Sequence, residues 1–111
     1  MKLPNAERAI IDISKLRDYC LDSRHPRGKH KARVFKSALG FTQTDADALK
    51  QAIETGILNA ECEVAEEDPY GRRFVVDFEI RRGDRSAQIR ALWIIKHGEE
   101  APRLTSCYVR E

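Results

Sequence analysis

The residues best suited to chemistry gather in one short segment, positions 23 to 44, which holds six Lys or Arg, two His and no acidic residue. His25 lies among these cations, and their repulsion favours the neutral imidazole, the form that accepts a proton. A neutral histidine beside a bound phosphate is a candidate general base. His30 has a similar but weaker claim. The alternative for both is a surface histidine without a catalytic task.

A helix is expected to begin at Lys29, and its first turn would hold Lys29, His30 and Lys31. Each exposed cation there is unfavourable by ~0.3–1 kcal/mol, because the helix dipole is positive at this end. A bound anion would reverse that effect, and Gly28 would let it approach free backbone N–H groups. The alternative is a solvated basic helix that pairs with the acidic segment 45–69 of the same chain. The candidate phosphate- or RNA-binding residues are Arg24, Arg27, Gly28, His30, Lys31, Arg33 and Arg103.

The last expected strand concentrates hydroxyl groups next to an arginine. Arginine stabilises the charge of a phosphoryl-transfer intermediate, and hydroxyl groups donate hydrogen bonds to its oxygens. Serine, threonine and tyrosine are also ordinary strand residues, so Tyr108 has an alternative place in the core. The candidate catalytic residues are His25, Lys29, Arg90, Thr105, Ser106 and Tyr108.

The cysteines and the composition exclude several other classes of protein. The three cysteines are far apart and form no CxxC pair, which argues against a Cys-only zinc site or a disulfide framework and suits the reduced cytoplasm. No acidic residue or cysteine accompanies His25 and His30, so we expect no metal and no cofactor. No apolar run has the ~18 residues of a membrane span, and we expect no leader peptide and no membrane association.

A length of 111 residues predicts one domain, residues 1–111. Apolar spacing predicts helices over 14–21, 29–39 and 44–55, with Gly40 ending the second and a Thr44–Asp47 capping box opening the third. Alternating apolar residues predict strands over 73–81 and 86–96, with further strands at 61–65 and 103–109.

Helices followed by strands predict an α+β fold, in which N-terminal helices pack on one face of a three- to four-stranded antiparallel sheet. The alternation leaves the other face open and polar, because Asp77, Glu79, Gln88 and Arg90 point away from the apolar side. We expect the functional site on or near that open face.

Several segments resemble a small bacterial domain family of unassigned function, found alone and as terminal modules of polymorphic toxins. They are residues 15–21 (KLRDYCL), 25–35 (HPRGKHKARVF), 39–41 (LGF) and 102–108 (PRLTSCY). More distantly, helices followed by an antiparallel sheet, with an upstream His and Lys and a hydroxyl-bearing last strand, resemble the barnase/EndoU/colicin/RelE group of metal-independent ribonucleases.

The distant resemblance implies RNA cleavage by attack of the 2′-hydroxyl on the adjacent phosphate. His25 would take the proton, Lys29 and Arg90 (or Arg103) would stabilise the phosphorane, and Thr105, Ser106 or Tyr108 would orient it. His25→Ala would then abolish cleavage while changing stability by less than ~0.5 kcal/mol.

Such a toxin implies a neighbour-encoded antitoxin or immunity protein as its partner. Two alternatives from other classes stay open. One is a non-catalytic binding module, for example an immunity or antitoxin-like protein whose acidic residues 61–68 face a basic partner. The other is a plain nucleic-acid-binding domain, whose affinity would fall steeply with salt.

Overall fold

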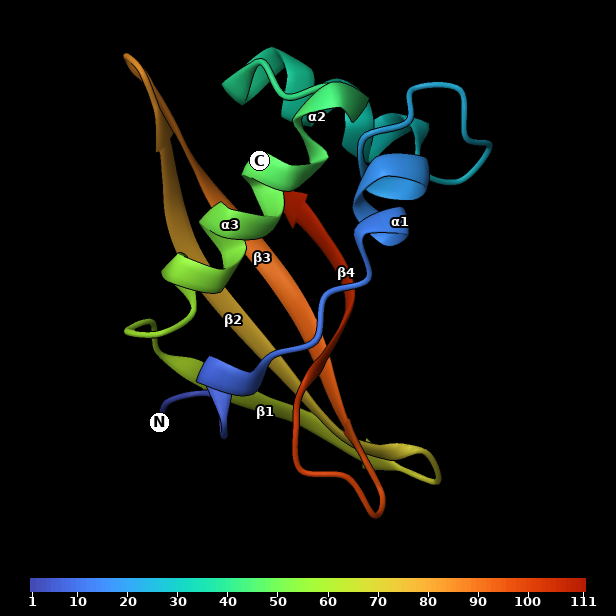
Figure 1. Cartoon of the computed structure of the whole chain (residues 1–111), viewed down its shortest axis with the longest axis vertical. Coiled ribbons are helices and arrows are strands. Elements are labelled where there is room, and N and C mark those ends of the chain that lie inside the picture. The colour runs from blue at the N-terminus through green and yellow to red at the C-terminus, as the bar shows by residue number, and fades with distance from the viewer.

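A computed structural model describes all 111 residues, in which helical elements precede one antiparallel sheet (Figure 1). The helical elements are η1 (Ala6–Arg8), α1 (Ile13–Lys15), the π turn η2 (Leu16–Cys20), α2 (Lys29–Leu39), η3 (Gln43–Asp45) and α3 (Ala46–Gly56). The strands are β1 (Cys62–Asp68), β2 (Gly71–Arg82), β3 (Arg85–Lys96) and β4 (Arg103–Val109), and they neighbour one another in chain order. The predicted α+β fold with an antiparallel sheet is therefore confirmed, with four strands.

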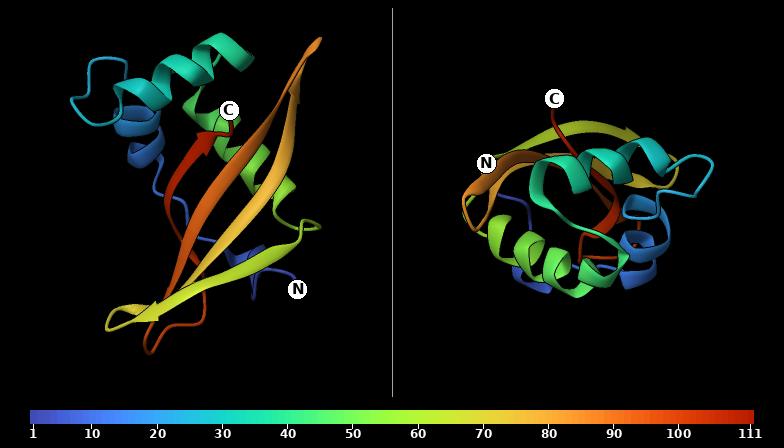
Figure 2. Two further views of the ribbon diagram at one scale, coloured as in Figure 1. Left: turned by 180° about the vertical axis from the view of Figure 1, so that it is seen from behind. Right: turned by 90° about the horizontal axis from the view of Figure 1, so that it is seen from above.

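Side-chain alternation along β2 and β3 separates a buried face from an open one. Phe74 pairs with Trp93 and Phe78 pairs with Ile89, and all four side chains are buried in the core. Between these pairs, Asp77 lies opposite Arg90 on the other face. Seen from behind, the strands lie in front of the helices and this face is uncovered (Figure 2, left). The open face is polar at Asp77 and Arg90, as expected, whereas Val75, Leu92 and Ile94 make the neighbouring part of the same face apolar.

The two longer helices pack against different parts of the sheet. α3 runs along one face of the sheet, while α2 lies across one end of it (Figures 1 and 2). α2 buries Ala32, Phe35 and Leu39 at helical spacing, and its bounds match the prediction. Gly40 ends the helix with φ 71°, a left-handed conformation that glycine adopts without strain. The outer face of α2 carries exposed lysine and arginine side chains.

Local structure departs from the expectations at three places. The capping box is Thr42 with Asp45, not Thr44 with Asp47, because a short 3-10 turn precedes α3. β1 extends to Asp68, beyond the expected 61–65, because a bulge between Val64 and Glu66 lets it continue along β2. The first predicted helix is mostly a π turn, a widened turn that often occurs at functional positions.

Candidate functional site at the junction of α2 and β4

A histidine holds the turn that leads into α2. The backbone N–H groups of Arg27 and Gly28 both donate to His25 Nδ1 at 3.0 Å, and the Lys29 N–H donates to the His25 carbonyl at 3.0 Å. Pro26 follows the cap, where its missing N–H and fixed φ suit a first helical turn. The side chain of His25 thus does what Asn, Asp or Ser commonly does at a helix start.

This cap corrects two expectations. The backbone N–H groups of Arg27, Gly28 and Lys29 are already paired with His25 and are not free for an anion. His25 Nδ1 already accepts two backbone N–H groups, so this nitrogen is not placed to take a proton from a substrate. Gly28 serves another purpose, because a Cβ at this position would collide with the Tyr19 carbonyl oxygen. Its lack of a side chain lets α2 lie against η2.

Tyr19 and Lys31 join η2 to α2 beside the end of β4. The Lys31 ammonium donates to Tyr19 Oη at 3.0 Å and lies 5.8 Å from the centroid of the Tyr108 ring. The His25 ring packs edge-on against Tyr19, with centroids 4.9 Å apart. The structure therefore brings together His25, Lys31 and Tyr108 from the predicted set, with Tyr19 added between them.

Arg90 extends this group onto the open face, directly across the ladder from Tyr108. Its guanidinium makes two bonds of 2.9 Å to the Asp77 carboxylate, and Arg110 makes a third at 3.0 Å. The Arg90 guanidinium holds the pKa of Asp77 below its ordinary value. Lys31, Arg90 and Arg110 face the Asp77 carboxylate and, at the edge of the adjoining hollow, the Glu111 side chain, so one positive charge remains in excess. We call Tyr19, His25, Lys31, Arg90 and Tyr108 the junction cluster.

A hollow of about 160 Å³ opens beside this cluster. At about 30 Å³ for a water molecule, it has room for roughly five water-sized groups. His30 also lines it, and His30 Nε2 lies 3.3 Å from the Glu111 carboxylate. If Nε2 donates to that carboxylate, Nδ1 is free to accept a proton. The lining residues are His30, Lys31, Val34, Tyr108, Val109 and Glu111.

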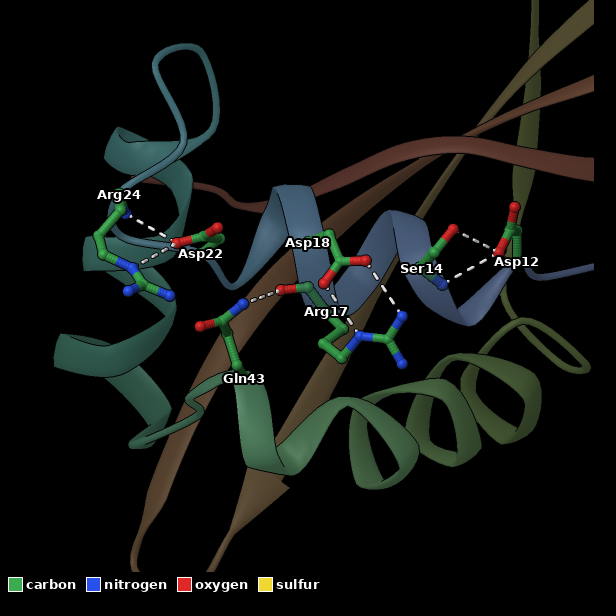
Figure 3. Close-up of polar contacts among 7 residues, drawn as sticks. All are labelled: Asp12, Ser14, Arg17, Asp18, Asp22, Arg24 and Gln43. Atoms are coloured by element: carbon green, nitrogen blue, oxygen red, sulfur yellow. Dashed lines mark hydrogen bonds and ion pairs between the residues drawn. The ribbon is translucent and has the colours of Figure 1, made fainter.

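The remaining predicted residues lie outside the junction cluster. Arg24 turns back onto Asp22, where its backbone N–H and its guanidinium both meet the carboxylate (Figure 3). Arg103, the expected alternative to Arg90 as the group that stabilises the phosphorane, pairs instead with Glu99 across the loop that precedes β4. Three further predicted residues are exposed to solvent and make no ion pair: Arg27, Lys29 and Arg33.

The three hydroxyl groups of β4 lie in different surroundings. Thr105 Oγ1 donates to the Leu92 carbonyl at 3.1 Å and borders an open-face groove of about 380 Å³. Ser106 Oγ is buried without a hydrogen-bond partner. Tyr108 lies against Lys31 of the junction cluster and is half-buried rather than in the core, whereas Thr105 only shares a surface hollow with Tyr19.

The basic helix is not neutralised by the acidic part of the chain, which corrects the alternative of internal pairing. Glu61 pairs with the N-terminus and Lys2, and Asp68 pairs with Arg73. No residue of β1 makes an ion pair with α2. The two elements lie at opposite ends of the molecule (Figure 1).

Short polar contacts hold η2 in place. Asp12 accepts from the Ser14 backbone N–H and hydroxyl, and the Gln43 amide donates to the Arg17 carbonyl at 2.8 Å (Figure 3). Sequence reasoning missed Tyr19 as part of the site. Its spacing with Leu16 and Cys20 indicates an apolar stripe, and no linear signal pairs it with Lys31, twelve residues away.

No three His, Cys, Asp or Glu side chains lie close enough together to share a metal ion. No helix of this fold has the length and apolar character needed to span a bilayer.

The fold and the junction cluster together define a small α+β domain, in which a basic helix crosses one end of a four-stranded meander that has one uncovered face. Residues 2–111 match the family described as Domain of unknown function (DUF6883), and the chain belongs to that family. Comparisons with curated proteins and with solved structures find no match.

Proposed function

We propose that the protein is a metal-independent endoribonuclease whose active site is the junction cluster with its hollow. One observation carries the proposal. Lys31 from the helix and Tyr108 from the last strand meet beside a hollow, with Arg90 next to them and positive charge in excess. A phosphodiester that gains negative charge during attack by its 2′-hydroxyl would be stabilised there.

The chemistry needs a proton acceptor, charge stabilisation and orientation. His30 takes the first role in place of His25, because it lines the hollow and has a carboxylate to orient its ring. Lys31 and Arg90 stabilise the phosphorane, and the Tyr108 hydroxyl donates to one of its oxygens. His25 and Tyr19 act as positioning residues that hold the start of α2 and the Lys31 ammonium.

The outer face of α2 supports RNA as the substrate class. Arg27, Lys29, Arg33 and Lys36 are exposed and make no ion pair. Such a row would bind successive phosphates of an RNA strand without base specificity. Binding without cleavage is the second candidate function, favoured by this same row.

The toxin role rests on the resemblance of the sequence to polymorphic toxin modules. A toxin of this kind needs a neutralising partner in the cell that makes it. We propose an acidic antitoxin or immunity protein that covers the α2 face, since charge complementarity speeds association and excludes RNA from the same surface.

Purified protein incubated with single-stranded RNA in EDTA tests the proposed activity. His30→Ala, Lys31→Met and Tyr108→Phe should each lower the cleavage rate, by roughly 10²- to 10⁴-fold for the proton-transfer residue His30. Lys50→Met on α3 is the matched control for Lys31→Met and should cleave like the wild type.

Cleavage that survives all three site variants would place the activity elsewhere or in a contaminant. Tight, salt-dependent RNA binding without any cleavage would reject the enzyme and support the binding domain. Neither binding nor cleavage, with stoichiometric capture of a neighbour-encoded basic protein, would favour the non-catalytic module with residues 61–68 as its acidic surface.

A further inference from the structure

Two cysteines far apart in the sequence lie in contact beneath the junction cluster. The Cys107 thiol of β4 donates to Cys20 Sγ at the end of η2, with 3.9 Å between the sulfur atoms. Both side chains are fully buried. A disulfide has an S–S distance of about 2.05 Å, so a shift of about 2 Å would join them. The third cysteine, Cys62, is in β1 at the opposite edge of the sheet.

The two thiols are chemically unequal. The hydrogen bond from Cys107 lowers the pKa of Cys20, and the Lys31 ammonium acts in the same direction. That same hydrogen bond and burial raise the pKa of Cys107. Because the thiolate is the reactive form, Cys20 is the nucleophile of the pair and Cys107 is placed to resolve its oxidised product.

Access to Cys20 runs through η2. This element is a single π turn of five residues behind a three-residue helix, and its Arg17 and Asp18 side chains are exposed. A hollow of about 360 Å³ lies against its outer side, lined by Ser14, Lys15, Asp18, Tyr19 and Thr105. Opening of this one turn would expose Cys20.

We propose that Cys20 and Cys107 are a dithiol that reacts with hydroperoxides to form a disulfide between η2 and β4. The Cys20 thiolate attacks the peroxide, the O–O bond breaks, and Cys20 becomes a sulfenic acid as hydroxide leaves. The Cys107 thiolate then attacks that sulfur and displaces a second hydroxide. The two thiol protons convert both hydroxides to water, so two thiols and one hydrogen peroxide give one disulfide and two waters.

The disulfide alters the junction cluster, because Tyr19 immediately precedes Cys20 and Tyr108 immediately follows Cys107. Drawing the sulfur atoms together moves these two rings relative to Lys31, which lies 4.8 Å from one ring centroid and 5.8 Å from the other. Loss of RNA cleavage on oxidation is the functional consequence, and that consequence rests on the proposed function.

The test uses folded protein that carries Cys62→Ser, so that Cys20 and Cys107 are its only cysteines, and treats it with hydrogen peroxide. Intact mass should fall by two hydrogen atoms, both thiols should disappear, and peptide mapping should find Cys20 joined to Cys107. The thermal midpoint should rise, because the bond closes a loop of 87 residues in the unfolded chain, and dithiothreitol should reverse the change. The ring resonances of Tyr19 and Tyr108 should shift in NMR spectra. Cys20→Ser and Cys107→Ser, each combined with Cys62→Ser, should form no intramolecular disulfide.

Two free thiols after treatment, sulfinic acid at Cys20 without a cross-link, or a bond only between separate molecules would each overturn the proposal. RNA cleavage by the oxidised protein should fall at least tenfold and return on reduction. A disulfide with unmoved tyrosine resonances and an unchanged cleavage rate would refute control of the site. A disulfide with shifted tyrosine resonances in a protein that never cleaves RNA would refute the proposed function while supporting the dithiol.

Discussion

His25 shows how one side chain can be given two different tasks by sequence and by structure. Its surroundings in the sequence indicate a general base, whereas its Nδ1 accepts the backbone N–H groups of Arg27 and Gly28, just before α2. The ring packs on Tyr19, which in turn accepts from Lys31. His25 therefore acts on the site through the position of Lys31.

If His25 holds the turn before α2, its variants should behave in the opposite way from those of a catalytic base. His25→Ala should lower the free energy of unfolding by about 0.5–2 kcal/mol, because two backbone donors lose their acceptor. His25→Asn supplies another acceptor and should recover most of that stability and of the cleavage rate. Urea denaturation of both variants measures the difference. A catalytic base would instead leave His25→Ala stable and His25→Asn inactive.

Asp77 gives a second prediction at this scale, concerning pH. Its pKa is lowered in the folded protein by Arg90, so its charge stabilises the fold above the unfolded pKa of about 3.9. That contribution is lost as pH falls through the lower folded pKa. Asp77→Asn should therefore reduce stability by about 1 kcal/mol at neutral pH, and the gap from wild type should close below about pH 4.

Thermal midpoints of the wild type and Asp77→Asn, measured between pH 2 and 7, report this difference in stability. Glu54→Gln, at a position without an ion pair, is the control and should stay close to wild type throughout. A constant gap for Asp77→Asn across the whole pH range would show that the pair with Arg90 contributes through packing rather than charge.

Among the elements, α2 and the central strands could be predicted from their sequence because their signals are local. Ala32, Phe35 and Leu39 recur at helical spacing before Gly40, and Phe74 to Ile80 alternate strictly. The junction cluster could not be predicted in this way. Tyr19 and Lys31 meet only because η2 packs against α2, and Cys20 meets Cys107 across 87 residues. Such contacts depend on tertiary packing and leave no periodic trace in the chain.

The close approach of η2 and α2 gives a prediction at the element scale. Gly28→Ala should destabilise the fold by about 1–3 kcal/mol, since its Cβ would overlap the Tyr19 carbonyl and force the two elements apart. The cleavage rate should fall as well, because Lys31 would lose its place beside Tyr19. Gly83→Ala is the control for replacing a glycine away from the site. An added Cβ at Gly83 meets no atom within 4 Å, but its φ is 64°. This variant should therefore lose only the stability that backbone strain costs.

Circular dichroism melts and RNA cleavage assays of these variants separate the two effects. A Gly28→Ala protein with wild-type stability and activity would mean that η2 and α2 do not need this contact.

The whole molecule separates its charges, although its net charge is only +2. The basic outer face of α2 lies at one end, and β1 with its exposed Glu63, Glu66 and Glu67 lies at the other (Figure 1). Under the proposed function, this separation would attract an RNA strand to the α2 end of the molecule.

This separation predicts a particular salt dependence. Replacing Lys29, Arg33 and Lys36 by Gln should weaken RNA binding, and the slope of log K against log salt should become shallower by about 0.7 for each lost phosphate contact. Replacing Glu63, Glu66 and Glu67 by Gln should leave that slope unchanged. Fluorescence anisotropy with a labelled single strand measures both. Equal losses in the two triple variants would contradict an oriented basic face.

The most direct test of the central claim compares one RNA strand with the same strand carrying 2′-O-methyl groups at every sugar, both incubated with the wild-type protein in EDTA. If the junction cluster promotes attack by the 2′-hydroxyl, the first strand is cut to products ending in 2′,3′-cyclic phosphate and the methylated strand stays intact. Cleavage of both strands, or of neither, would contradict the account.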